Sequence, residues 1–319
     1  VRPSNWLDGG QLSASRYGHS VTVLPGGLVL VVGGVTGTTA TVLTELYDPS
    51  TGAFVSVNQL TVARYNHTAT LLNDGRVLIA GGAGSNEQPT TSVEIFNPGT
   101  KTWNTAQPMN TARASHSATL LGNGQVLVAG GGSSPSTTTA CELFNPTTGQ
   151  WTTTQALNSA RKLHIAQRLS NGEVLVAGGY SSASQGGIAT AERYSPATGM
   201  WSTAGSMSVA RWLHSSTVLP SGVTVVCGGL PGTSSTSVAS CEQFSAPASW
   251  STAPPMSLGR NEFSMTMTPS GLVLAIAGST TSSSLNSNAS TEWFDGGAWA
   301  PGPVLPSGRS GAQVRRGPK

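Results

Sequence analysis

Residues 64–103 read RYNHTATLLNDGRVLIAGGAGSNEQPTTSVEIFNPGTKTW, and this stretch carries every mark of a unit that recurs along the chain. An arginine followed three residues later by a histidine begins the unit, a Gly-Gly pair comes next, and a glutamate, an aromatic residue and a tryptophan close it. The arginine recurs at steps of 48 to 50 residues, at Arg16, Arg64, Arg113, Arg161, Arg211, Arg260 and Arg309. Regular spacing over that length indicates a repeat protein.

The other marks keep their order in every copy. The glycine pair is present in five copies, and in the sixth we expect it at Gly278-Ser279; the histidine is lost there too. Short apolar runs such as Val77 to Ala80, bounded by glycine, predict strands that are covered on both faces. Asn73-Asp74-Gly75 and its counterparts predict tight hairpin turns. Since no stretch shows capped helical periodicity, we expect almost no helix.

A period near 50 residues with a double glycine and a late tryptophan resembles the kelch repeat, in which one copy forms one blade of a β-propeller. The resemblance covers nearly the whole chain. It implies an all-β fold, a six-bladed kelch-type β-propeller with four antiparallel strands per blade. We expect one domain over residues 1–319, with blades starting near residues 16, 64, 113, 161, 211 and 260.

The ends of the chain leave two arrangements open. In one, residues 1–15 help to close the ring by completing the sixth blade, and residues 309–319 are a spare tail. In the other, 309–319 start a further repeat, and both ends build a partial seventh blade.

Composition narrows the class of partner. Charged residues make up 9% of the chain and the formal net charge is +3, with no cluster of Lys and Arg among aromatics, which predicts no nucleic-acid binding. No run of 18 apolar residues occurs, so we expect no membrane insertion. We expect a monomer, and for its location we lean toward a secreted or cell-surface protein. Thirteen arginines against three lysines are typical of a GC-rich bacterial genome.

Most of the chemically active residues belong to the repeat. A glutamate present in all six copies is expected to bind strand-end amides or to pair with a repeat arginine, and the five repeat histidines are expected to be structural. We predict no metal and no cofactor: nucleotide, zinc and EF-hand motifs are missing. The copper radical oxidases, which are kelch-type propellers, need histidine ligands, and this chain has no histidine outside the repeat. Cys227 and Cys241 flank one hairpin loop symmetrically, as a disulfide or as two buried thiols.

The resemblance also implies where a partner would bind. In kelch domains the repeat arginine and the residues after it lie at the mouth of the central pocket. The predicted binding residues are Arg16, Tyr17, Arg64, Tyr65, Arg113, Arg161, Lys162, Arg211, Trp212, Arg260, Asn261 and Glu262. Trp212 either stacks on a sugar or apolar group or covers a blade junction. Lys162 suits a carboxylate or an acidic peptide, and Glu262 is the candidate general base.

Two classes of function follow, with a third alternative beside them. The first is a binding module for a protein or glycan partner, which the scarcity of titratable groups outside the repeat favours. The second is a cofactor-independent small-molecule enzyme, similar to the kelch-type sialic acid mutarotases, with Glu262 transferring protons. The third is a scaffold that binds no ligand at this pocket.

Overall fold

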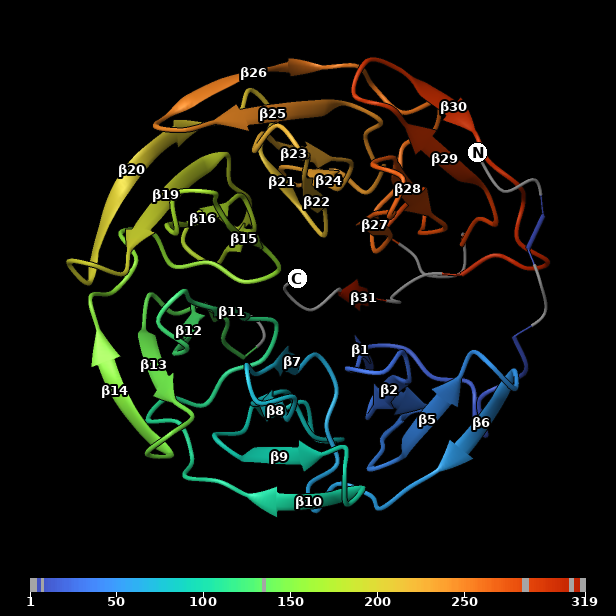
Figure 1. Cartoon of the computed structure of the whole chain (residues 1–319). Coiled ribbons are helices and arrows are strands. Elements are labelled where there is room, and N and C mark those ends of the chain that lie inside the picture. The colour runs from blue at the N-terminus through green and yellow to red at the C-terminus, as the bar shows by residue number, and fades with distance from the viewer. Residues whose placement is uncertain (1–4, 7–8, 134–135, 283–286, 310–312, 316–319) are drawn as a thin grey trace. The chain divides into compact units, whose positions relative to one another are not determined.

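The computed structural model describes residues 5–6, 9–133, 136–282, 287–309 and 313–315. Within these residues all regular structure is β, and none of them forms a helix long and apolar enough to span a membrane. Six antiparallel sheets follow one another along the chain, and each takes four strands from one repeat (Figure 1). The prediction of an all-β fold with six blades of four antiparallel strands each is confirmed.

The chain divides into two compact units of three blades each. The first unit comprises Leu7–Leu157 with Gln313–Lys319, and the second comprises Val1–Trp6 with Asn158–Ala312. The expectation of one domain over residues 1–319 stays a prediction.

The first unit contains blades one to three. Their strands are β1 (Ser20–Val23), β2 (Val29–Val32), β5 (Thr44–Asp48) and β6 (Ala53–Ser56); β7 (Thr68–Leu71), β8 (Val77–Ala80), β9 (Val93–Asn97) and β10 (Thr102–Thr105); and β11 (Ser117–Leu120), β12 (Val126–Ala129), β13 (Cys141–Asn145) and β14 (Gln150–Thr154). A short ribbon, β3 (Val35–Thr36) with β4 (Thr39–Ala40), follows the glycine pair of blade one.

The second unit contains blades four to six. Their strands are β15 (Ile165–Arg168), β16 (Val174–Ala177), β19 (Thr190–Ser195) and β20 (Met200–Ser206); β22 (Ser215–Val218), β23 (Thr224–Cys227), β25 (Cys241–Ser245) and β26 (Ser249–Ala253); and β27 (Ser264–Met267), β28 (Val273–Ile276), β29 (Thr291–Phe294) and β30 (Trp299–Pro301). Two short ribbons accompany them, β17 (Tyr180–Ser181) with β18 (Gly186–Gly187), and β21 (Arg211–Trp212) with β24 (Leu230–Pro231).

The second strand of each blade is the core of its sheet. All four residues of β8 are buried, because a blade is covered by a neighbour on each face. Between blades two and three the apolar side chains of Leu78, Val93, Val126 and Phe144 belong to one cluster. The predicted hairpins join the first and second strands. In blade two Gly75 has a φ of 85°, as a tight turn requires.

The glycine pair lies where two blades approach closely. A Cβ on Gly81, whose φ is 63°, would stand 2.4 Å from the carbonyl oxygen of Arg113 in the next blade. In the sixth repeat this position is Ala277, with a φ of 58°, and Gly278 follows it. The expected pair Gly278-Ser279 is therefore wrong by one residue: Arg260 Nη1 donates to the Ala277 carbonyl as Arg64 Nη1 donates to that of Gly81.

Two contacts involve residues near the ends of the chain. The indole of Trp6 donates to the Pro303 carbonyl at 2.8 Å, as that of Trp103 donates to the Asn58 carbonyl at 2.7 Å. Strand β31 (Gln313–Arg315) pairs in parallel with β1, while the sixth sheet takes its fourth strand, β30, from its own repeat. Residues 1–4, 7–8, 310–312 and 316–319 lie outside the described residues, and how the ring closes stays a prediction.

One disulfide joins adjacent strands of blade five. Cys227 on β23 stands directly opposite Cys241 on β25, with the two Cα atoms 4.2 Å apart, and their sulfurs are bonded. Of the two alternatives that the sequence leaves open, the structure has the disulfide. Cys141, at the equivalent position of blade three, is buried.

Candidate partner-binding surface

Each repeat arginine is held inside its own blade. Arg64 Nη2 donates to Glu94 Oε1 at 3.0 Å, and its Nη1 donates to the carbonyls of Gly81 and Ser92, both at 2.8 Å. The Glu94 carboxylate also accepts the backbone N–H of Thr61 at 2.8 Å. Burial lowers the pKa of Arg64, and the charge of Glu94 opposes that shift. The glutamate thus has both expected roles, as partner of the arginine and as acceptor for strand-end amides.

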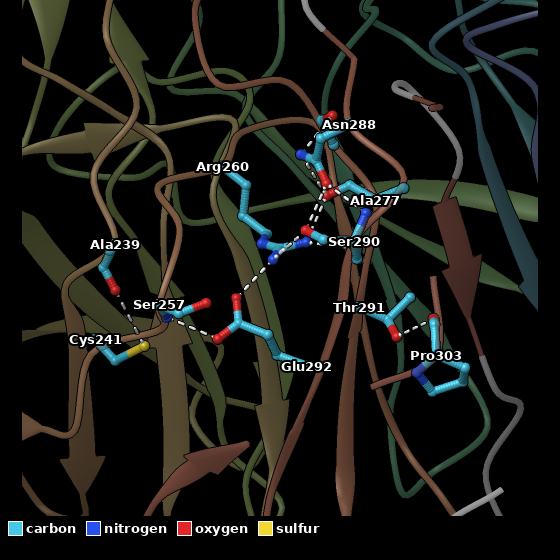
Figure 2. A network of polar contacts seen from close by, with 11 residues as sticks. Ala239, Cys241, Ser257, Arg260, Ala277, Asn288, Ser290, Thr291, Glu292 and Pro303 are labelled. Atoms are coloured by element: carbon cyan, nitrogen blue, oxygen red, sulfur yellow. Dashed lines mark hydrogen bonds and ion pairs between the residues drawn. The ribbon is translucent and has the colours of Figure 1, made fainter. Parts of the chain in front are cut away.

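The same network occurs in every blade. The equivalent ion pairs are Arg16–Glu45, Arg113–Glu142, Arg161–Glu192, Arg211–Glu242 and Arg260–Glu292. Figure 2 shows the pair of blade six, in which Glu292 also accepts the Ser257 N–H at 2.7 Å. All six arginine side chains have no exposed surface, so the arginines that were predicted to contact a partner lie out of its reach.

Two repeat histidines of the first unit join neighbouring blades. His67 Nε2 lies 2.8 Å from the Ser20 hydroxyl of the preceding blade, and His116 Nε2 lies 2.9 Å from that of Thr68. Burial lowers the pKa of His67 to about 3, so its ring is neutral at ordinary pH. Among the described residues, no group of three His, Cys, Asp or Glu side chains could hold a metal ion.

The residue after each arginine, here called the +1 residue, pairs with a loop after the glycine pair. The +1 residues are Tyr17, Tyr65, Ala114, Lys162, Trp212 and Asn261. Tyr17 is 53% exposed, whereas Ala114 is buried. Asn261 is only 1% exposed, and its amide donates to the Ser237 hydroxyl and the Thr281 carbonyl, both at 2.7 Å. This leaves Tyr17, Tyr65, Lys162 and Trp212 accessible among the predicted +1 contacts.

The next residue, the +2 residue, has a left-handed backbone in all six blades. The +2 residues are Gly18, Asn66, Ser115, Leu163, Leu213 and Glu262, with φ between 49° and 65°. Their backbones form a line within each unit: Leu213 N–H donates to the Leu163 carbonyl at 3.3 Å, and Glu262 N–H to the Leu213 carbonyl at 3.1 Å. The side chains of all three are half-buried.

An aromatic cluster joins blades four and five beside that line. The Lys162 ammonium lies 5.4 Å from the centre of the Tyr180 ring, and the Trp212 ring meets Tyr180 edge-on at 5.7 Å. A Cβ on Gly187 would lie 3.0 Å from Trp212 Cδ1, so the β17–β18 hairpin covers one edge of the indole. Trp212 therefore covers a blade junction and still has accessible surface. Tyr180, Leu163 and Leu213 were not among the predicted binding residues, although a comparison of equivalent positions between copies would have found them.

Glu262 is the +2 residue with a charge. Burial raises the pKa of its carboxyl, and no ion pair or side-chain hydrogen bond engages it among the described residues. Lys162 and Glu262 thus stand at the two ends of the line through Leu163 and Leu213. We call these four residues with Trp212 the second-unit strip.

A separate hollow of about 450 Å³ lies at the opposite ends of the strands in the first unit. Hairpin turns of blades one and two line it, with Pro25, Asp74 and Asn97 among them. Asp74 is already paired with Arg76 at 2.7 Å, and no predicted binding residue reaches this hollow.

Solved structures with the same fold include one enzyme. A novel fungal alcohol oxidase of the AA5 family, in complex with copper, superposes with a TM-score of 0.75 and 18% identity over 93% of this chain and 67% of that one. The structure of YjhT superposes with a TM-score of 0.69 and 12% identity over 92% and 96% of the two chains. At these identities the likeness concerns the fold alone.

Sequence comparison identifies the family. No curated protein sequence matches this chain. A family model described as the KLHDC2/KLHL20/DRC7 Kelch-repeats domain matches residues 18–229, which is about two thirds of the sequence. The chain therefore belongs to the kelch-repeat domain family.

Proposed function

We propose that this kelch domain is an interaction module that binds a protein partner through the second-unit strip. Kelch β-propellers commonly serve in protein interaction, and the strip combines an aromatic ring, two leucines and two charges on neighbouring loops. Trp is enriched among the residues that dominate binding energies, and clustered, accessible apolar side chains mark interaction sites.

One observation carries the proposal, namely leucine at two left-handed +2 positions. A left-handed backbone costs a residue with a Cβ roughly 1–2 kcal/mol, and Gly or Asn lowers that cost. The first unit has Gly18, Asn66 and Ser115 at these positions, whereas the second has Leu163 and Leu213 with their side chains half-buried. Neither backbone geometry nor solubility favours that choice, but contact with an apolar partner does.

The test places the +2 residue types of the first unit at the +2 positions of the second. Immobilised protein is offered a random library of capped peptides, and retained peptides are measured by mass spectrometry. We expect Leu163→Ser with Leu213→Asn to lower retention about tenfold without lowering the unfolding midpoint. Val55→Ser removes a side chain that is 55% exposed on β6 and serves as the matched control. Unchanged retention in the double variant, or an equal loss in the control, contradicts the proposal.

A glycan partner is a separate outcome of the same design. In that case a glycan library is retained through the Trp212 ring and the peptide library is not. Trp212→Ala then abolishes retention, whereas Leu163→Ser has little effect.

A second candidate is a cofactor-independent small-molecule enzyme that uses Glu262. The observation in its favour is that burial raises the pKa of this carboxyl, which is the direction of shift expected of a group that transfers protons. Against it, the Arg260 guanidinium is paired with Glu292 at 2.6 Å and has no exposed surface with which to hold a substrate carboxylate. Turnover of a sugar-acid library that is lost in Glu262→Gln and kept in Glu262→Asp would support the enzyme.

A further inference from the structure

The charge of Lys162 lacks an acidic partner among the described residues of its own unit. Its ammonium forms no ion pair with any of them, while the neighbouring Arg161 is neutralised by Glu192 at 2.8 Å. Of the positive charges predicted for this surface, only Lys162 is therefore available to a ligand in blades four to six. Burial lowers the pKa of Lys162, so its charged form loses hydration for which its own unit supplies no counter-charge.

The aromatic pair beside Lys162 covers one side of its ammonium. One side of the ammonium faces the Tyr180 ring, which attracts a cation but offers no hydrogen-bond acceptor of full strength. The Trp212 ring closes the side of Tyr180 that faces blade five. A carboxylate on the accessible side of Lys162 would pair with the ammonium and compensate for the hydration that the ammonium loses on burial.

When its carboxyl is ionised, Glu262 has the opposite effect at the other end of the strip. The +2 line runs from Leu163, next to Lys162, through Leu213 to Glu262, with each step made by a backbone hydrogen bond between neighbouring blades. An anionic group is therefore favoured near Leu163 and disfavoured beyond Leu213. Such a combination of attraction and repulsion gives specificity and orientation more than affinity.

We infer that the partner presents a peptide segment with one carboxylate side chain over Lys162 and an apolar side chain against Leu163, Leu213 and Trp212. This inference rests on the proposed function and specifies the chemistry of its partner. The segment carries no second carboxylate where it crosses Glu262.

Three libraries of capped peptides test the inference. All have one fixed leucine, and two residues away they have a fixed glutamate, glutamine or lysine. We expect the wild-type protein to retain the glutamate library most and the lysine library least. Lys162→Gln lowers retention of the glutamate library about fivefold, to the level of the glutamine library, because it removes one charge-assisted contact. Lys162→Arg keeps the preference. Glu262→Gln raises retention of a fourth library with glutamate on both sides of the leucine.

The outcomes separate this inference from the proposed function. Equal retention of the glutamate and glutamine libraries, or a glutamate preference that survives Lys162→Gln, overturns the partner chemistry and leaves the interaction module standing. No retention of any library by the wild-type protein contradicts the proposed function as well. Loss of the preference in Val55→Ser would also overturn the inference, since that side chain lies on the fourth strand of blade one.

Discussion

The two three-blade units share one backbone plan and differ at the positions that the plan leaves accessible. Every blade has the arginine–glutamate pair and the left-handed +2 residue, whichever unit it belongs to. The accessible +2 residues are small and polar in the first unit, but leucine or glutamate in the second. Residues that build the blade are the same in every copy, whereas residues without this structural role differ between copies. The positions that differ therefore locate the candidate surface.

The units also differ inside. In the first, hydroxyl groups at the start of β1 and β7 reach the histidine of the next blade. In the second, β15 starts with Ile165, which offers no hydroxyl, and the contact recorded for the His214 ring is with the backbone of Ala177. The next repeat has Phe263 in place of the histidine. The second unit has thus lost part of the polar network between its blades.

Breaking the arginine–glutamate pair should have the largest effect, and the effect should be equal in both units. Glu142→Ala in the first and Glu192→Ala in the second each leave a fully buried arginine without its counter-charge. Removal of one partner of a buried pair costs about 3–5 kcal/mol. Urea unfolding followed by tryptophan fluorescence measures both. Asp74→Ala, which removes an exposed pair, is the control. A cost below about 1 kcal/mol in either unit, the range of a surface pair, would show that its pair is not structural.

Acid should destabilise the fold through its buried histidines. Burial lowers the pKa of His19 to about 4 and those of His67 and His214 to about 3, against 6.5 in the unfolded chain. As the pH falls below 6.5, the unfolded chain takes up protons that the folded chain refuses until about pH 4 to 3. The free energy of unfolding therefore decreases over that window and is unaffected by these groups above it.

Replacement of one histidine by phenylalanine, the residue of the sixth repeat, isolates the contribution of that histidine to the pH dependence of stability. His214→Phe should reduce the slope of unfolding free energy against pH between about pH 4 and 6 by up to about 1.4 kcal/mol per pH unit. Denaturant titrations at several pH values measure the slope for both proteins. An identical slope would mean that His214 takes up its proton equally readily in the folded and the unfolded chain.

The glycine pair offers a smaller contrast between the units. Gly81→Ala places a Cβ within 2.4 Å of the Arg113 carbonyl in a left-handed backbone and should cost about 2 kcal/mol. In the second unit Ala277 already stands at the equivalent position, with a φ of 58°. Ala277→Gly should therefore leave stability unchanged or raise it by about 1 kcal/mol. Equal destabilisation by both changes, measured by thermal unfolding, would remove the contrast.

The sequence predicts the structural features that recur in every copy. It does not predict the direction in which an individual side chain points. The blades, the hairpin at Asn73-Asp74-Gly75 and the role of the glutamate follow from patterns present in every copy. The burial of Arg211 next to the accessible Trp212 does not follow from such a pattern. These two adjacent residues face opposite ways only because β21 pairs with β24. Leucine by itself gives no signal of the left-handed backbone at Leu213, and only the equivalent Gly18 and Asn66 in other copies indicate it.

The mismatch between Ile165 and His214 is the smallest effect that can be predicted, and a double-mutant cycle can resolve it. Ile165→Thr puts a hydroxyl at the position from which Thr68 bonds His116 at 2.9 Å, but it also removes buried apolar surface. The single variant is therefore ambiguous, whereas its difference in cost between the wild-type and His214→Phe backgrounds isolates the new hydrogen bond. We expect Ile165→Thr to be less destabilising by about 1 kcal/mol when His214 is present. Zero coupling would mean that the hydroxyl and the ring do not meet, and that the rule joining consecutive blades in the first unit does not extend to the second.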